Sequence, residues 1–322
     1  MLTIRTAVIS GVLLLAQAAF PVFAQTWPTR PLRLVVPFSA GGSTDQTARV
    51  LAEGLRPVLG QTLLVDNRPG AGGNIAAELV ANATPDGYTY LVSGATMAAN
   101  MSLYRNLRYD FVRDFAHVSQ TFSSSNVLVV VPNLPVANLA EFIAYVKSGQ
   151  HTVNYGSGGH GTSQHLAAAL FNNMVAGKMV HVPYKGGAPA TIALLSGEIH
   201  TIFAPLIEVL PHIRAGSIKA LAVTGKKRSP LLPNAPVIGD LLPGYETSSW
   251  GGISAPAKTP AAIVNKLNEA IVKVLTQPAV KVHLAEADKE PVGSTPAQFN
   301  QFIAIEVERL RTQVKISGAK AD

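Results

Sequence analysis

Short runs of apolar residues alternate with longer amphipathic stretches along most of this chain. The first run, residues 32–36, precedes a helical stretch over 44–59. Two further strand-like runs, 62–65 and 88–92, enclose an alanine-rich helical segment over 75–83. Strands that alternate with helices are typical of a parallel sheet covered by helices. The N-terminal part of the chain is therefore predicted to form an open α/β sheet.

The alternation is interrupted once and then resumes. Residues 118–121 and 127–131 are predicted to be consecutive strands, separated only by the serine-rich segment Ser123–Asn126. Because no helix joins these strands, we place a crossover between two lobes here. A second α/β series follows, with strands expected at 152–155, 179–182, 200–203 and 218–223 and helices at 139–147, 164–173, 189–196 and 206–214.

The C-terminal part is predicted to return to the first lobe. A strand is expected over 249–255, after a proline-rich passage. Pro260, Pro278 and Pro296 each stand where proline suits the first turn of a helix. With no further alternation, we expect these helices to pack back onto the first lobe.

Two crossings between the lobes, near residues 124 and 247, would form a two-strand hinge that permits closure. The predicted division is a first lobe of residues 25–124 with 248–322 and a second lobe of residues 125–247.

Glycine-rich turns follow four of the predicted strands, and helical sequence follows each turn. Glycine lets a ligand approach the backbone, and the first turn of a helix offers unpaired N–H groups to an anion. Two turns fall in the first third of the chain and two near its middle. This layout predicts two lobes that hold one small anion between them. The turns span residues 37–45, 67–74, 155–163 and 183–187.

Composition narrows the class of protein. The chain has 322 residues, 48% of them hydrophobic and only 14% charged, which suits a folded protein with a sizeable core. The formal charge of +7 falls to +6 if Arg5 is removed, and the basic residues are scattered apart from Lys226–Arg228. No basic helix or RNP-like motif is present, so we expect no nucleic-acid partner. The absence of cysteine excludes disulfides, thiolate metal sites and cysteine nucleophiles.

The N-terminus predicts export. One positive charge precedes an apolar stretch over residues 7–19, and Val22-Phe23-Ala24 has small residues at the −3 and −1 positions of a cleavage site. This pattern is typical of a secretory signal peptide, residues 1–24, cleaved after Ala24. The alternative is an uncleaved membrane anchor, but the apolar stretch is short for a span and Pro21 interrupts it. The mature protein is predicted to be periplasmic.

An ordered series of short motifs resembles the Bug-type extracytoplasmic receptors of tripartite tricarboxylate transporters (TTT). No single segment is decisive, but together they cover essentially the whole mature chain in the family's order. The matching segments are residues 27–31, 36–45, 65–74, 85–89, 155–158, 181–186, 221–224, 228–230, 243–245 and 291–293.

The resemblance implies a type II periplasmic-binding fold, with two α/β lobes and a ligand cleft between them. It also implies a monomeric receptor that captures a small carboxylate and delivers it to a membrane permease, with no enzymatic activity, cofactor or metal. In this family, backbone amides and ordered waters make many of the hydrogen bonds to the ligand, which agrees with anion binding at helix starts.

Carried onto this sequence, the resemblance implies a ligand site drawn from both lobes. The first lobe would contribute Ser39, Ala40, Gly41, Gly42, Asp45, Gly72, Gly73, Asn74, Gly94, Ala95 and Thr96. The second would contribute Ser157, Gly158, Thr162, Ser163, His165, Tyr184, Lys185 and Gly186. Many members have an aspartate where this chain has Ala204. We interpret Ala204 as a change that disfavours an amino-acid ligand and favours an apolar or aromatic carboxylate.

Three other chemistries can be weighed against the receptor. Gly156, Gly158 and Gly161 match a dinucleotide fingerprint, but the next strand ends in His181-Val182 without the acidic residue that binds ribose. A metal site is conceivable at histidines 160, 165 and 181, although no carboxylate cluster accompanies them.

An exported hydrolase using Ser157 or Ser163 with His165 is the enzyme alternative. It lacks a Gly-x-Ser-x-Gly elbow and an orienting carboxylate nearby in sequence. A receptor that signals to a sensor protein, rather than feeding a permease, also stays open.

Overall fold

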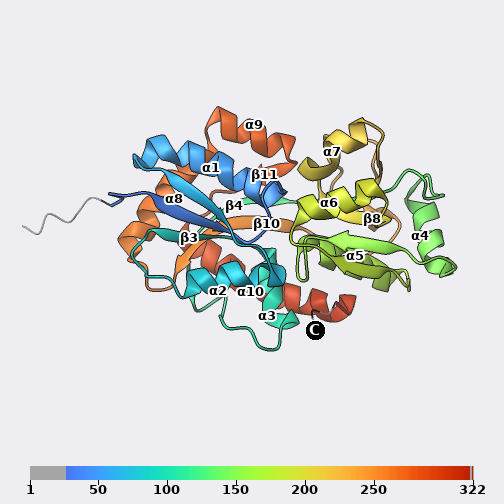
Figure 1. Cartoon of the computed structure of the whole chain (residues 1–322), viewed down its shortest axis with the longest axis horizontal. Coiled ribbons are helices and arrows are strands. Elements are labelled where there is room, and N and C mark those ends of the chain that lie inside the picture. The colour runs from blue at the N-terminus through green and yellow to red at the C-terminus, as the bar shows by residue number, and fades with distance from the viewer. Residues whose placement is uncertain (1–26, 320, 322) are drawn as a thin grey trace, which may run out of the picture.

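Two separate β-sheets, each flanked by helices, lie side by side in the computed structural model, which describes residues 27–319 and 321 (Figure 1). The predicted signal peptide lies outside the described residues. In spatial order the first sheet contains β11 (Lys289–Pro291), β4 (Phe115–Ser124), β10 (Ser249–Pro256), β3 (Thr89–Gly94), β1 (Leu32–Val36) and β2 (Leu63–Asn67). The second contains β7 (Val180–Pro183), β6 (Asn154–Ser157), β8 (Thr201–Pro205), β5 (Asn126–Val130) and β9 (Lys219–Val223). We call each sheet with its helices lobe 1 and lobe 2.

The first strand after each crossing between the lobes runs antiparallel to its neighbours. β5 is antiparallel to β8 and β9, and β10 is antiparallel to β3 and β4. The β1–β2, β1–β3, β6–β7 and β6–β8 pairs are parallel. Their carboxyl ends, and the helices that follow, therefore lie at one edge of each sheet, which is where ligands bind in open α/β folds.

Within residues 27–319, ten α-helices cover the sheets, and most lie close to the ranges predicted from the sequence. Lobe 1 has α1 (Ser43–Leu59), α2 (Asn74–Ala81), α3 (Ala95–Leu103), α8 (Ala261–Leu275), α9 (Pro278–Glu286) and α10 (Pro296–Ser317). Lobe 2 has α4 (Leu139–Ser148), α5 (Ser163–Met174), α6 (Gly187–Ser196) and α7 (Leu206–Arg214). None of these helices in the described residues combines the length and apolar character of a membrane span.

Two elements were not predicted from the sequence. Helix α3 buries seven of its nine residues, so it lacks the polar stripe that identifies a surface helix. Strand β11 is only three residues long, Lys-Glu-Pro, and carries no apolar alternation. Both elements contribute to the cleft described below.

Each sheet lies over hydrophobic core. In β1 the side chains of Leu34 and Val36 belong to the core cluster beneath α1 and α8, whereas Val35 belongs to the cluster with α2, α3 and α10. Alternate residues of a strand face opposite sides of the sheet. A continuous apolar run is therefore needed because helices cover both faces.

The two crossings between the lobes lie against each other. The chain leaves lobe 1 between Ser124 and Asn126 and returns before Ser249, which is paired with Ser124. The backbone N–H of Asn126 donates to Thr224 Oγ1 at 2.9 Å, and that hydroxyl donates to the carbonyl of Thr247 at 3.2 Å.

The C-terminal helix contacts both lobes, rather than lobe 1 alone as the sequence suggested. Helix α10 packs on α3 and β4 of lobe 1 and also on α5 of lobe 2 (Figure 1). Leu166 of α5 belongs to the same buried cluster as Phe299 and Ile303 of α10. The apolar face of a 22-residue helix is long enough to reach across the boundary.

Candidate ligand-binding cleft

A cavity of about 90 Å³ lies between the lobes, with walls from both. Its apolar wall includes Phe38, Leu51, Val92, Phe122 and Trp250. Its polar wall includes hydroxyl groups of Thr47, Thr96, Thr121, Thr162 and Ser163. An apolar pocket with a few converging polar groups is the usual form of a small-molecule site.

Four helices begin at this cavity, two from each lobe. Ser43 at the start of α1 and Ala95 at the start of α3 line it from lobe 1, and Ser163 of α5 and Gly187 of α6 line it from lobe 2. They converge because each follows a strand that ends at the same edge of its sheet. The first N–H groups of a helix have no partner within the helix and carry partial positive charge. The cavity is therefore suited to an anion.

Glu208, which is not among the residues predicted from the sequence, places a carboxylate inside the cavity. Its Oε1 accepts the backbone N–H of Ser43 at 2.7 Å, across the lobe boundary, and its Oε2 accepts from the Gln164 amide at 3.2 Å. Burial raises the pKa of this carboxyl group. Glu208 lies in the first turn of α7, directly after β8, so the strand-end rule was a signal that could have found it.

Lys289 places an ammonium in the same cavity. Its Nζ donates to Thr47 Oγ1 at 2.6 Å and to the Ser43 carbonyl at 3.3 Å, and it lies 4.3 Å from the centre of the Phe122 ring. Burial lowers the pKa of Lys289 to about 7, and the nearby negative charge of Glu208 partly offsets that shift. Lys289 belongs to β11, which no sequence pattern indicated, so nothing in the sequence pointed to it.

Seven of the residues predicted for the site line the cavity. They are Gly42, Gly94, Ala95, Thr96, Gly158, Thr162 and Ser163. The Thr162 side chain also caps α5, because its Oγ1 accepts the His165 N–H. All seven lie at or next to helix starts; Gly42, Gly158, Thr162 and Ser163 belong to the glycine-rich turns, whereas Gly94, Ala95 and Thr96 were predicted from the family resemblance.

Four of the other predicted residues, Ser39, Gly72, Lys185 and Gly186, lie where the two lobes contact each other instead of lining the cavity. The Ser39 N–H donates to the Lys185 carbonyl at 3.0 Å, and the Ser39 hydroxyl donates to the same oxygen at 2.6 Å. A Cβ on Gly186 would lie 3.1 Å from the Ser39 nitrogen, and one on Gly72 would lie 2.5 Å from the His160 carbonyl oxygen. The first turn thus contacts the fourth, and the second contacts the third, which leaves no room for side chains.

Asp45 and Asn74 are held in networks within lobe 1. The buried Asp45 carboxylate accepts from the Gly41 N–H, the Arg49 guanidinium and the Asn67 amide. These hydrogen bonds lower its pKa although burial acts in the opposite direction. Asn74 Oδ1 accepts from Asn100 and from the Tyr109 hydroxyl.

The remaining predicted positions lie outside the cavity lining. The Tyr184 hydroxyl donates to Glu198, Ala40 and Lys185 are exposed, and Gly73 is buried beside Met97. Ala204 is fully buried in the lobe 2 core. The carboxylate that enters the cavity from this region is Glu208, one helical turn further along the chain.

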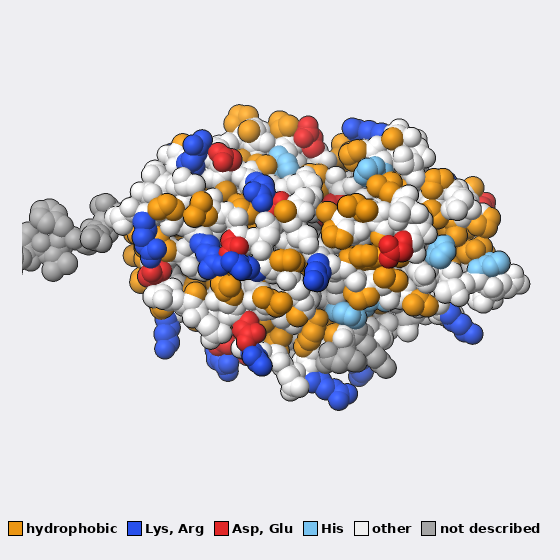
Figure 2. All heavy atoms as spheres, in the orientation of Figure 1, with side chains coloured by type: hydrophobic (Ala, Val, Ile, Leu, Met, Phe, Trp, Pro, Cys, Tyr) orange, Lys and Arg blue, Asp and Glu red, His pale blue; other side chains and the backbone are white. Residues whose placement is uncertain are grey.

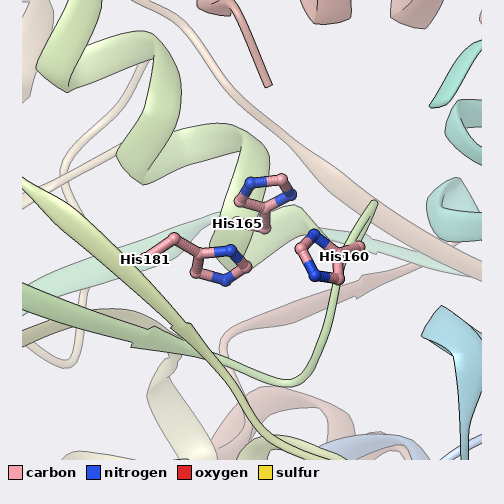
Figure 3. Close-up of side chains that lie close together, drawn as sticks. All are labelled: His160, His165 and His181. Atoms are coloured by element: carbon pink, nitrogen blue, oxygen red, sulfur yellow. The ribbon is translucent and has the colours of Figure 1, made fainter. Parts of the chain in front are cut away.

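Three histidines cluster behind the third glycine-rich turn (Figure 3). One ring nitrogen each of His160, His165 and His181 lies within 4.8 Å of the others. Burial lowers the pKa of His165 to about 4, so its ring is neutral at pH 7, as a metal ligand requires. The rings of His165 and His181 are stacked 4.0 Å apart and nearly parallel. Lone pairs lie in the ring plane, so these two cannot point at one ion unless a ring rotates.

Ser157 and His165, one of the two serine–histidine pairings in the enzyme alternative, do not form a triad. The Ser157 hydroxyl is paired with His181 Nε2 at 2.6 Å, not with His165, and it also bonds the Gly159 backbone. Ser157 is 0% exposed. Among the described residues no carboxylate is hydrogen-bonded to His165 or His181. A nucleophile needs access to substrate and a base oriented by a third group, and both are missing here.

Comparison with known proteins agrees with the resemblance drawn from the sequence. Residues 47–318 match the family model described as "Tripartite tricarboxylate transporter family receptor". Protein BugT of Bordetella pertussis is 37% identical over 98% of this chain and 97% of its own length. The chain belongs to this receptor family.

Solved structures show the same fold. The periplasmic binding protein BugD superposes with a TM-score of 0.88 and 32% identity, covering 91% of this chain and 99% of its own. An R. palustris protein solved with adipate superposes with a TM-score of 0.87 and 38% identity, again over 91% and 99% of the two chains. The fold is therefore the two-lobed periplasmic-binding type, as the sequence predicted.

Proposed function

We propose that this protein is an extracytoplasmic receptor that captures a small organic carboxylate in the cleft and delivers it to a tripartite membrane permease. The observation that carries the proposal is the meeting of four helix starts from two lobes at one cavity. The adipate in the related R. palustris structure supports a carboxylate as ligand.

Capture would proceed by closure. In the open form the helix starts and Lys289 are accessible, and the ligand contacts both lobes only when they approach. A ligand shifts a two-state equilibrium by the difference in its affinity for the two states. Contacts between the glycine-rich turns, such as Ser39 with Lys185, then stabilise the closed form, which would dock on the permease as a monomer.

The proposal is tested by thermal unfolding of residues 25–322 with a panel of carboxylates, amino acids and nucleotides. A ligand at 100 times its Kd adds about 2.7 kcal/mol to the free energy of unfolding, which shifts Tm by several degrees. A selective shift with carboxylates is expected. No shift with any of them, or a shift with nucleotides alone, would overturn the function.

Delivery to a permease needs a separate experiment. Uptake of the labelled ligand should fall in cells that lack this receptor and recover when the gene is restored. If uptake is unaffected while ligand binding still changes gene expression, the signalling receptor is the better assignment. For the hydrolase alternative, Ser157→Ala should leave ligand binding intact, and ligand should be recovered chemically unchanged.

A further inference from the structure

The cavity has one charged side chain from each lobe, and their hydrogen-bonding capacity is only partly used. Of the described residues that line it, Lys289 of lobe 1 and Glu208 of lobe 2 are the charged ones; the rest are apolar or neutral polar. Charged groups in such a confined site are costly unless they have partners. Lys289 and Glu208 therefore determine which hydrogen-bonding and charged groups a ligand must carry.

Lys289 offers a donor that has no acceptor yet. An ammonium has three N–H donors. Two are directed at Thr47 Oγ1 and the Ser43 carbonyl, both neutral. Within the described part of the chain no carboxylate lies within ion-pair distance of Nζ. An anionic ligand group would supply the missing counter-ion.

Glu208 offers acceptor sites at the lobe 2 wall. A carboxylate has about four lone-pair sites, of which the Ser43 N–H and the Gln164 amide occupy two. A second carboxylate placed beside it would be repelled, whereas an ammonium or hydroxyl group would fill the remaining sites. Glu208 therefore favours a ligand that carries a hydrogen-bond donor, such as an ammonium or hydroxyl group.

We propose that Glu208 and Lys289 set the ligand class of this receptor to small acids that also carry an amino or hydroxyl group. The ligand carboxylate pairs with Lys289, and its donor group hydrogen-bonds Glu208, with Phe122 packed along the apolar part. This inference rests on the proposed function. It replaces the sequence interpretation of Ala204, because the selecting carboxylate stands at residue 208.

The test uses pairs of acids that differ only in the donor group. Calorimetry would measure the Kd of the purified protein for aspartate against succinate, malate against succinate, and 4-aminobutyrate against butyrate. A site built around a hydrogen-bonding substrate group rejects the analogue that lacks it. The donor-bearing acid should bind at least about 10-fold more tightly in one or more pairs.

Two variants separate the roles of the charges. Glu208→Gln keeps the shape but removes the charge, and it should abolish the preference for the amino acid over its partner. Lys289→Met should weaken both members of a pair alike, by at least about 10-fold. The fold should stay intact, because a buried ammonium without an ion-pair partner is costly and methionine removes that cost. Glu269→Gln and Lys273→Met on the exposed face of α8 are matched controls and should change neither Kd nor preference.

The outcomes distinguish this inference from the function on which it rests. Equal affinity for the two members of every pair, or a preference that survives in Glu208→Gln, overturns the ligand class while the carboxylate receptor stands. If none of these acids binds the wild-type protein, this ligand class is overturned. The receptor function falls with it only if the wider carboxylate panel also gives no thermal shift.

Discussion

The buried ionisable residues His117 and Lys289 differ in how completely the protein satisfies their hydrogen bonds. His117, which is 1% exposed, has hydrogen bonds on both ring nitrogens: Nε2 with the Phe111 carbonyl at 3.0 Å and Nδ1 with the Ser254 hydroxyl at 2.9 Å. A carbonyl only accepts, so Nε2 carries the proton and Nδ1 accepts from Ser254. The ring is thus held neutral, whereas the buried Lys289 faces a cavity where a ligand can pair with it. A buried ionisable side chain whose hydrogen bonds are all made within the protein indicates a structural role. One that is only partly hydrogen-bonded and faces a cavity indicates a role in binding.

The burial of His117 predicts a loss of stability in acid. Burial lowers its pKa from 6.5 to about 4, so between these values the unfolded chain binds a proton that the folded chain does not. The contribution to stability is complete above pH 6.5 and falls as the pH drops towards 4. Between pH 7 and 5 the loss should be about 2 kcal/mol. Denaturant unfolding of wild type and His117→Gln at both pH values measures it, and an equal pH dependence in both would contradict this assignment.

At the scale of elements, the glycine-rich turns set how closely the lobes approach. Gly72, at φ +59°, packs against the His160 backbone of lobe 2, and Gly158 packs against Gly186 within lobe 2. These glycines bring backbone against backbone, so the turns shape the lobe boundary as well as the cavity. The sequence pattern located the turns correctly, but which residues face the cavity and which face another turn depends on the approach of segments distant in sequence.

Gly72→Ala should impair closure. An added Cβ would lie 2.5 Å from the His160 carbonyl oxygen, so the lobes could not reach their present contact. Gly60→Ala is a matched control, because its φ is +69° and nothing lies within 4 Å of the added Cβ. Both variants should lose about 1–2 kcal/mol through left-handed backbone strain. Only Gly72→Ala should lower ligand affinity, by at least about 10-fold, and keep the radius of gyration large with ligand present. Equal affinities in the two variants would show that this contact does not limit closure.

At the scale of the whole molecule, the lobes are joined by more than the two chain crossings. Helix α10 packs on both, and Leu166 of lobe 2 is buried in a core cluster that otherwise belongs to lobe 1. A hinge movement must therefore either carry α10 with one lobe or slide Leu166 along it. The proposed closure must therefore involve the C-terminal helix, which also covers the first sheet.

Replacing Leu166 should uncouple the lobes. Leu166→Ala and the control Leu170→Ala lie in the same helix and are 2% and 7% exposed, but Leu170 belongs to the lobe 2 core. Each should cost about 2–5 kcal/mol. Hydrogen exchange should report faster opening of α10 only in Leu166→Ala, whereas Leu170→Ala should act on lobe 2. Faster exchange of α10 in both variants would contradict a special role for Leu166.

The sequence by itself determined the class of fold, the order of most elements, the receptor family and the starts of α1, α5 and α6, which line the cavity. These features are local: apolar periodicity, glycine after a strand and proline at a helix start leave their mark within a few residues. The sequence did not reveal α3, because a helix buried on all sides has no alternation of apolar and polar faces. It did not reveal β11 either, because a three-residue strand is too short to show an alternating pattern.

Only the tertiary structure decided which side chains give the cleft its chemistry. Glu208 and Lys289 are 81 positions apart in sequence, and both line the same cavity because α7 and β11 begin there, from opposite lobes. Likewise, the contacts between turns and the reach of α10 across the boundary arise from how the two sheets are placed. A pairing between distant segments depends on the packing of the whole chain, so no local pattern records it.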